Sequence, residues 1–194
     1  MPVAEARVAE VTGKVRAFYE ETCFPGYEEY DGPLELVDKA RRGTYARMLD
    51  DQVPYSARVL DVGCGTGQLP VFLSLNRRRA VGADLSLGSL RKGQEFKQRF
   101  GLKHVAFVEM DLFEPALRPA SFDYVFCNGV LANQSTTLDF KFQLHHMFHR
   151  LQYLQSGADD LRPDAGSFQH TDQRFCGMAR LKDGTAIFNQ IIPK

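Results

Sequence analysis

Three glycines follow the first strongly apolar run of the chain at every second position. Residues 58–67 read RVLDVGCGTG, in which Gly63, Gly65 and Gly67 alternate with other residues. Glycine lets the backbone turn sharply and leaves room for a ligand, and a helix that begins after such a loop offers it free N–H groups. Dinucleotide-binding loops have the spacing G-x-G-x-x-G, so this spacing argues mildly against a nicotinamide cofactor. A purely structural turn is the alternative.

An acid ends the next apolar run, about twenty residues further on. Asp84 is the last residue of the segment VGAD. A carboxylate at this position can accept hydrogen bonds from both hydroxyl groups of a ribose. It can alternatively cap the helix that is expected to follow, whose start contains Ser86 and Ser89. The two roles are compatible.

Two more polar residues follow predicted strands. The Asp111 carboxylate can accept a hydrogen bond from an adenine amino group, while Met110 and Leu112 line the faces of the ring. Asn128 comes after FDYVFC and can present an amide to a reacting centre. Taken singly, Asp111 could be a turn residue and Asn128 a cap of the strand end. Their common position after successive strands favours a binding site.

Short apolar runs alternate with helical segments from residue 58 onward, which is the pattern of parallel βαβ units. The expected strands are 58–62, 80–83, 105–109 and 122–127, and the expected helices between them are 67–75 and 87–100. Such strands form a doubly wound sheet whose ligand crevice lies outside their carboxyl ends. All four candidate segments described above come at those ends.

The composition is that of an ordinary globular protein. The 194 residues are 44% hydrophobic, and the 24 Lys and Arg balance the 24 Asp and Glu, so nothing suggests a nucleic-acid partner. The basic cluster 77–79 is expected to be a solvated loop. The four scattered cysteines indicate free thiols. With no signal peptide and no apolar run of membrane length, we expect a cytoplasmic protein without a membrane partner.

Four segments resemble the successive signature motifs of class I S-adenosylmethionine-dependent methyltransferases. They are VLDVGCGTG, GADLS, VEMDLFEP and FDYVFCNGVL, within residues 58–131. The resemblance is greatest to the bacterial group that includes quinone-biosynthesis methyltransferases. It implies a Rossmann-like fold, S-adenosylmethionine as the cofactor, and contacts of Asp61, Gly63 and Gly65 with the methionine moiety. It also implies that Asp84 binds the ribose and Asp111 contacts the adenine.

The segments before the core are similar to a lid that precedes it in some bacterial members. We expect helices at 3–21 and 34–50 around an irregular loop rich in proline, glycine and aromatic residues. The resemblance implies that aromatic side chains such as Tyr19, Phe24 or Tyr27 close over the cofactor.

The chain departs from the family after Leu131. It lacks a KPGG-type turn into a fifth strand, and a hairpin is predicted at 174–192, with its turn at Asp183-Gly184. We therefore expect a shortened or atypical C-terminal part within a single domain. That domain comprises the lid (1–56), the cofactor-binding core (57–131) and the C-terminal part (132–194).

The predicted function is methyl transfer to a small-molecule acceptor. A noncatalytic cofactor-binding protein or partner subunit is one alternative, and a nucleotide-dependent oxidoreductase is another. No residue is nominated as the catalytic base, the oligomeric state is open, and no metal is expected, because His145, His146 and His149 lack further ligands beside them. The predicted cofactor-binding residues are Asp61, Gly63, Cys64, Gly65, Gly67, Asp84, Leu85, Asp111, Leu112 and Asn128.

Overall fold

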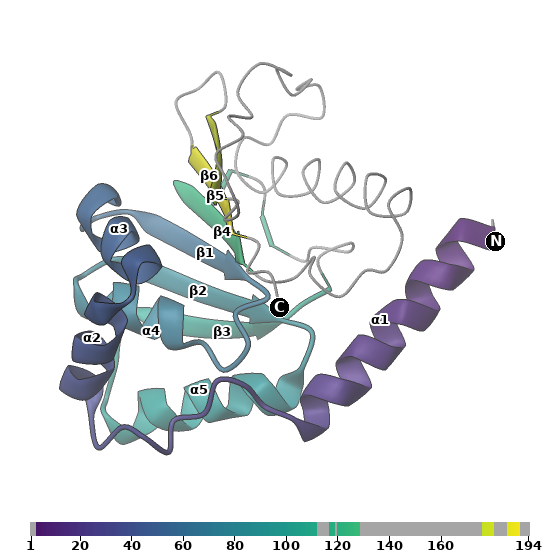
Figure 1. The fold of residues 1–194 in the computed structure, drawn as a ribbon, viewed down its shortest axis with the longest axis horizontal. Helices are drawn as coiled ribbons and strands as arrows, with labels where there is room; N and C mark the ends of the chain where they lie inside the picture. Colours follow the sequence, from purple (N-terminus) through teal and green to yellow (C-terminus); the bar gives the residue numbers. More distant parts are fainter. Residues whose placement is uncertain (1–2, 112–116, 119, 129–175, 181–185, 191–194) are drawn as a thin grey trace.

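The structure is a computed structural model that describes residues 3–111, 117–118, 120–128, 176–180 and 186–190. These residues form one sheet with helices beside it, and the N-terminal helix extends away from the sheet (Figure 1). The strands are β1 (Arg58–Val62), β2 (Arg79–Asp84), β3 (Val105–Glu109), β4 (Tyr124–Asn128), β5 (Cys176–Arg180) and β6 (Ala186–Gln190). The helices are α1 (Val3–Glu21), α2 (Pro33–Arg42), α3 (Thr44–Gln52), α4 (Gln68–Leu75) and α5 (Leu87–Arg99).

The strand order of the sheet is β3-β2-β1-β4-β6-β5. The first five strands in this order, β3, β2, β1, β4 and β6, are each parallel to their neighbours. The last strand, β5, pairs with β6 in the antiparallel direction. The register sets Asp84 opposite Glu109 and Asp61 opposite Gly82. The predicted α/β class, a Rossmann-like and mostly parallel sheet, is confirmed, and the loops after β1, β2 and β3 meet at one edge.

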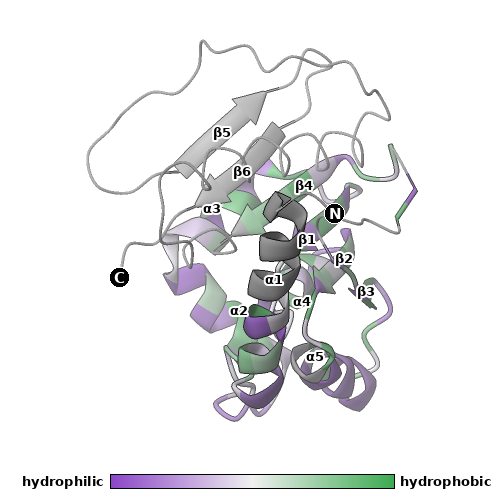
Figure 2. Ribbon diagram, turned by 90° about the vertical axis from the view of Figure 1, so that its right-hand side faces the viewer, coloured by the Kyte–Doolittle hydropathy of each residue, from purple (hydrophilic) through white to green (hydrophobic). Residues whose placement is uncertain are grey.

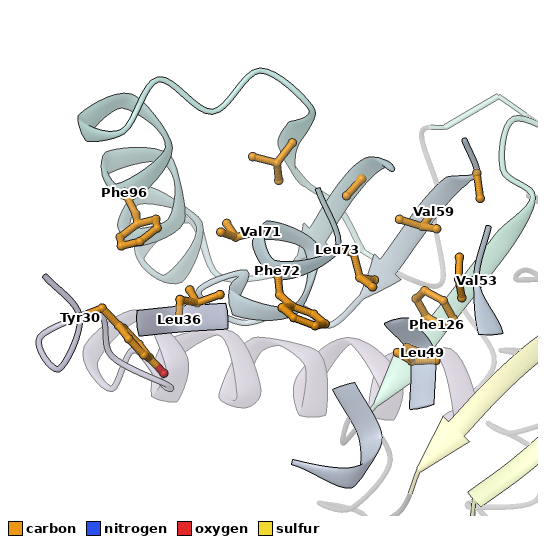
Figure 3. Close-up of a cluster of buried hydrophobic side chains, with 13 residues drawn as sticks. Tyr30, Leu36, Leu49, Val53, Val59, Val71, Phe72, Leu73, Phe96 and Phe126 are labelled. Atoms are coloured by element: carbon orange, nitrogen blue, oxygen red, sulfur yellow. The ribbon is translucent and has the colours of Figure 1, made fainter. Parts of the chain in front are cut away.

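Apolar side chains of α2, α3, α4 and α5 bury one face of the sheet (Figure 3). Val59 and Phe126 point to this face, where Phe72 of α4 is 1% exposed. The opposite face has a second cluster that includes Leu60 and Val125. Figure 2 shows the apolar residues concentrated in the strands and polar residues along α5. Each side chain buried in this way contributes about 1.5–3 kcal/mol.

The predicted helix at 34–50 is two helices in the structure. Gly43 has extended backbone angles (φ −79°, ψ 130°) and separates α2 from α3. Helical spacing continues across this break, so periodicity alone did not reveal it. By contrast, α1 has the bounds that its pattern predicts.

The prediction of a solvated basic loop at 77–79 is wrong for Arg78, whose side chain is 0% exposed. Its guanidinium donates hydrogen bonds to the backbone oxygens of Asp50 and Val53 and to the Asp50 carboxylate, at 2.5–3.0 Å. These oxygens belong to the end of α3, whose last carbonyls lack partners within the helix. Arg78 therefore fixes α3 to the turn before β2.

The C-terminal hairpin is described only in its strands. Cys176 pairs with Gln190 and Arg180 with Ala186 in the antiparallel register, and β6 lies beside β4. The turn at Asp183-Gly184, the three histidines at 145–149 and most of the segment expected to be atypical lie outside the described residues. The single-domain organisation stays a prediction. No helix within the described residues has the length and apolar character needed to cross a membrane.

A stability prediction arises from the contact of α5 with β3. A Cβ on Gly93 of α5 would lie 2.7 Å from Cζ of Phe107, and closer still to the Thr66 oxygen. Gly93→Ala is expected to lower the free energy of unfolding by about 1–3 kcal/mol, because the overlap outweighs the gain in helix propensity. Gly13→Ala is the matched control, since a Cβ at Gly13 of α1 would meet no atom within 4 Å. Urea denaturation that showed stabilisation of both variants would contradict this prediction.

Candidate functional site

The loop between β1 and α4 has the backbone geometry that its glycines predict. Gly63, Gly65 and Gly67 have φ angles of 70°, 57° and 82°, which lie in the left-handed region. The N–H groups of Gly63 and Cys64 donate to the carbonyl of Ala83 at 2.7 and 3.1 Å. The loop is therefore fixed to the end of β2, where the ribose carboxylate is predicted.

Two of these glycines also leave space for parts of the protein itself. A Cβ on Gly65 would lie 2.6 Å from the carbonyl oxygen of Phe24, and one on Gly67 would overlap the ring of Phe107. The glycine spacing predicts that this space is occupied by a ligand. The structure gives it, at these two positions, to the N-terminal segment and to the core.

Asp61 is buried at the end of β1, with 4% of its surface exposed. Burial, together with the nearby negative charge of Asp84, raises the pKa of Asp61 to about 8. Both of these causes disfavour the charged form of the carboxylate. A buried carboxylate in such surroundings favours a cationic partner, which is the chemistry of an α-ammonium group.

The Asp84 carboxylate is held by two backbone N–H groups. Oδ2 accepts from Gly65 at 2.7 Å, and Oδ1 accepts from Ser86 at 2.9 Å. Each oxygen has a second lone pair, so the carboxylate can still accept the hydroxyl groups of a ribose. The cap of α5 is Ser86, whose Oγ accepts from the N–H of Ser89, rather than Asp84.

The structure describes some of the other predicted cofactor residues fully and others only in part. Leu85 and Asp111 are partly buried at the ends of β2 and β3. Met110, expected to line the adenine, is 6% exposed and belongs to the second core cluster. Asn128 is the last residue of β4, but its side chain and the whole of Leu112 lie outside the described residues. The roles of all these residues stay predictions.

The two cysteines near the site are not poised as nucleophiles. Burial is the main cause that raises the pKa of the Cys64 thiol, with Asp61 and Asp84 adding to it. Burial, with Asp61, also raises the pKa of Cys127 to about 12. Thiolates are the reactive form, so neither residue fits nucleophilic catalysis.

The N-terminal segment passes over the ends of β3, β2 and β1 in that order. Arg16 of α1 lies 3.7 Å from a carboxylate oxygen of Glu109, which is the last residue of β3. The end of α1 contacts the start of α5, after β2. The loop that follows reaches the glycine loop, where Thr66 and Gln68 donate to backbone oxygens of Pro25 and Gly26.

The residues that hold this segment in place have no recognisable signal in the sequence. Thr66 lies within the glycine motif and Gln68 just after it, and Glu20 is about 67 positions from the backbone groups that it binds. Tyr27, expected over the cofactor, instead stacks on Phe96 of α5 at 4.4 Å and donates to the Thr66 oxygen at 3.1 Å. Phe24 remains 71% exposed.

Comparison with known families favours one of the alternatives. Residues 59–155, half of the 194, match a family model described as a methyltransferase domain. The chain belongs to this methyltransferase-domain family. The resemblance to class I S-adenosylmethionine-dependent methyltransferases is thereby confirmed, and S-adenosylmethionine is the cofactor of that family.

Solved structures share the fold of this methyltransferase domain. Magnesium protoporphyrin IX methyltransferase from Synechocystis PCC 6803, solved with bound SAH, is 21% identical, with a TM-score of 0.55 over 73% of this chain and 67% of that one. A protein from Pyrococcus horikoshii OT3 is 22% identical, with a TM-score of 0.53 over 61% of this chain and 53% of that one. The chain thus spans about half the length of the Pyrococcus protein. No curated protein matches the sequence significantly.

Proposed function

We propose that the chain catalyses S-adenosylmethionine-dependent methyl transfer to a small organic acceptor. The observation that carries this proposal is the arrangement of Asp61, Asp84 and the glycine loop at one edge of the sheet. The cationic ammonium group of the methionine moiety needs a buried carboxylate, and a ribose needs a carboxylate that accepts hydrogen bonds from its hydroxyl groups. The two carboxylates must lie at neighbouring strand ends. The family match supports the same cofactor.

Each residue would hold one part of the cofactor. Asp61 would accept the ammonium group of the methionine moiety, with Gly63, Cys64, Gly65 and Gly67 providing the backbone around it. Asp84 would accept the ribose hydroxyl groups. Asp111, with Leu85 and Leu112, would bind the adenine, and Asn128 would face the reacting centre.

The cofactor would supply an activated methyl group on a positively charged sulfur, and transfer of this group in line to a nucleophilic acceptor would leave S-adenosylhomocysteine. The task of the protein is then to align the acceptor and to exclude water, and such positioning contributes about 7–11 kcal/mol to catalysis. The segment 19–27 fits the second task, because its backbone is bound to Thr66, Gln68 and Ser86.

The acceptor that we propose is lipophilic, as in the quinone-biosynthesis group. Two aromatic side chains of the N-terminal segment support this: Phe18 is 59% exposed and Phe24 is 71% exposed, and the backbone of Phe24 lies against Gly65. The balance of 24 basic and 24 acidic residues favours such an acceptor over a nucleic acid. We further propose a cytoplasmic location without a membrane partner.

Calorimetric titration tests the cofactor directly. The purified chain is expected to bind S-adenosylmethionine and S-adenosylhomocysteine but not NAD. Asp84→Asn is expected to weaken both affinities by about 10- to 100-fold, because a hydrogen bond to a charged group contributes about 1.5–3 kcal/mol.

Asp123→Asn is the matched control for this titration. Its carboxylate pairs with Arg58 at 2.7 Å, at the opposite end of β1, so both affinities should stay unchanged. A folded wild-type chain that binds NAD but neither S-adenosylmethionine nor S-adenosylhomocysteine would overturn the proposed function.

A further inference from the structure

Glu20, near the end of α1, binds the start of α5 through its carboxylate. Oε1 accepts the N–H of Leu87 at 2.7 Å, and Oε2 accepts the N–H of Gly88 at 3.0 Å. The first N–H groups of a helix have no partner within the helix and carry its positive dipole end, so an acid there is stabilising. This acid comes from another element of the chain, and it therefore joins the N-terminal segment to α5.

The neighbouring backbone strengthens the same junction. The carbonyl of Tyr19 accepts hydrogen bonds from the hydroxyl groups of Ser86 at 3.0 Å and Ser89 at 3.4 Å. Ser86 is 1% exposed and Ser89 is 0% exposed, so these contacts are shielded from water. The first turn of α5 is thus held from two directions by residues 19 and 20.

Ser86 connects this junction to the predicted ribose site. Its N–H donates to Oδ1 of Asp84, and the other carboxylate oxygen, Oδ2, accepts from Gly65. The orientation of the Asp84 carboxylate therefore depends on where the first turn of α5 and the glycine loop are held. Glu20 acts on the first of these two supports.

We propose that Glu20 is a positioning residue for the ribose-binding carboxylate, because it fixes the turn whose Ser86 N–H orients Asp84. This inference rests on the proposed function, since it takes Asp84 as the ribose ligand. The proposal gives α1 a role in the cofactor site. Glu20 would set the geometry of the site by holding the backbone of the first turn of α5, without itself contacting the ribose.

The first test is a double-mutant cycle on S-adenosylhomocysteine binding. Glu20→Gln keeps the size of the side chain but removes its charge and one acceptor oxygen, and it is expected to weaken binding about fivefold. Glu21→Gln, an exposed neighbour on the same helix, should leave the affinity unchanged. In an Asp84→Asn background the effect of Glu20→Gln should disappear, because the carboxylate that it positions is gone. Additive losses in the double mutant would overturn the proposal.

The second test needs no ligand. Amide hydrogen exchange followed by NMR reports the protection of the Ser86 and Gly65 N–H groups that bind Asp84. Glu20→Gln is expected to increase the Ser86 exchange rate severalfold relative to Glu21→Gln, with exchange in the central strands unchanged. Equal Ser86 protection in the two variants would contradict the positioning role. If the wild-type chain fails to bind S-adenosylhomocysteine, the proposed function fails, and this exchange measurement still decides whether Glu20 orders the turn.

Discussion

Arg78→Leu is expected to destabilise the fold by about 3–5 kcal/mol. The substitution removes four hydrogen bonds, made at 2.5–3.0 Å to Asp50 and to the backbone oxygen of Val53. It leaves the Asp50 carboxylate, whose side chain is only 11% exposed, with a smaller set of donors. Losing one partner of a buried charge pair is costly because the other charge stays desolvated. Urea denaturation at pH 7 measures the loss.

The pH dependence separates this charge effect from lost packing. Partial burial raises the pKa of Asp50, but hydrogen bonds from Arg78 and Asn76 outweigh it, and the net pKa lies below the ordinary 3.8. A lowered pKa contributes stability above the ordinary value and loses it as the pH falls through the folded-state pKa. The deficit of Arg78→Leu should therefore shrink below about pH 4.

Arg79→Leu is the control for the same stretch of chain. Arg79 is exposed at the start of β2, and its replacement should change the stability by less than about 0.5 kcal/mol. Equal losses at the two positions would show that the buried guanidinium contributes no more than a surface one.

The strands of the sheet could be predicted because each one is indicated by the residues of its own segment. The strands at 58–62 and 105–109 have the predicted bounds, since each is a short apolar run with clear ends. The glycine loop was predictable in the same way, because left-handed backbone angles require a residue such as glycine. Asp84 followed from its position at a strand end.

Contacts between distant residues were not predictable. Arg78 resembles any arginine in a basic cluster, and only the fold shows that the end of α3 surrounds it. Glu20 and Leu87 are 67 positions apart, and neither carries a local signal for the other. The sequence placed Ser86 and Ser89 at the start of a helix, but it did not indicate that Ser86 is the cap or that both hydroxyl groups bind the carbonyl of Tyr19. Tertiary packing determines such pairs.

Asp61→Asn is expected to stabilise the unliganded protein, by about 2 kcal/mol at pH 7. The pKa of Asp61 is raised to about 8, mainly by burial and further by Asp84. At pH values between the ordinary carboxyl pKa and about 8, Asp61 keeps its proton in the folded state but has lost it in the unfolded state. Stability therefore falls as the pH rises through this range, and about three pKa units set a limit of about 4 kcal/mol at pH 7. Asparagine removes this penalty.

The gain should grow from about pH 4 to about pH 8 and then level off. Asp123→Asn is the contrast, because a hydrogen bond from Arg58 lowers the pKa of Asp123 below its ordinary value, so the effect of its removal should stay constant between pH 5 and pH 8. Denaturant melts at pH 5, 6, 7 and 8 measure both slopes. Parallel slopes for the two variants would contradict the assignment of Asp61 as a carboxylate held at a cost to stability.

The same substitution should weaken cofactor binding at least tenfold, because the neutral amide forms a weaker hydrogen bond to an ammonium group than a carboxylate does. The ionised form of Asp61 binds a cation, so wild-type affinity for S-adenosylhomocysteine should rise with pH up to about 8, and Asp61→Asn should lose this part of the dependence. A variant that is more stable yet binds more weakly would identify Asp61 as a residue retained for its ligand. A variant that gains stability and keeps its affinity would remove Asp61 from the site.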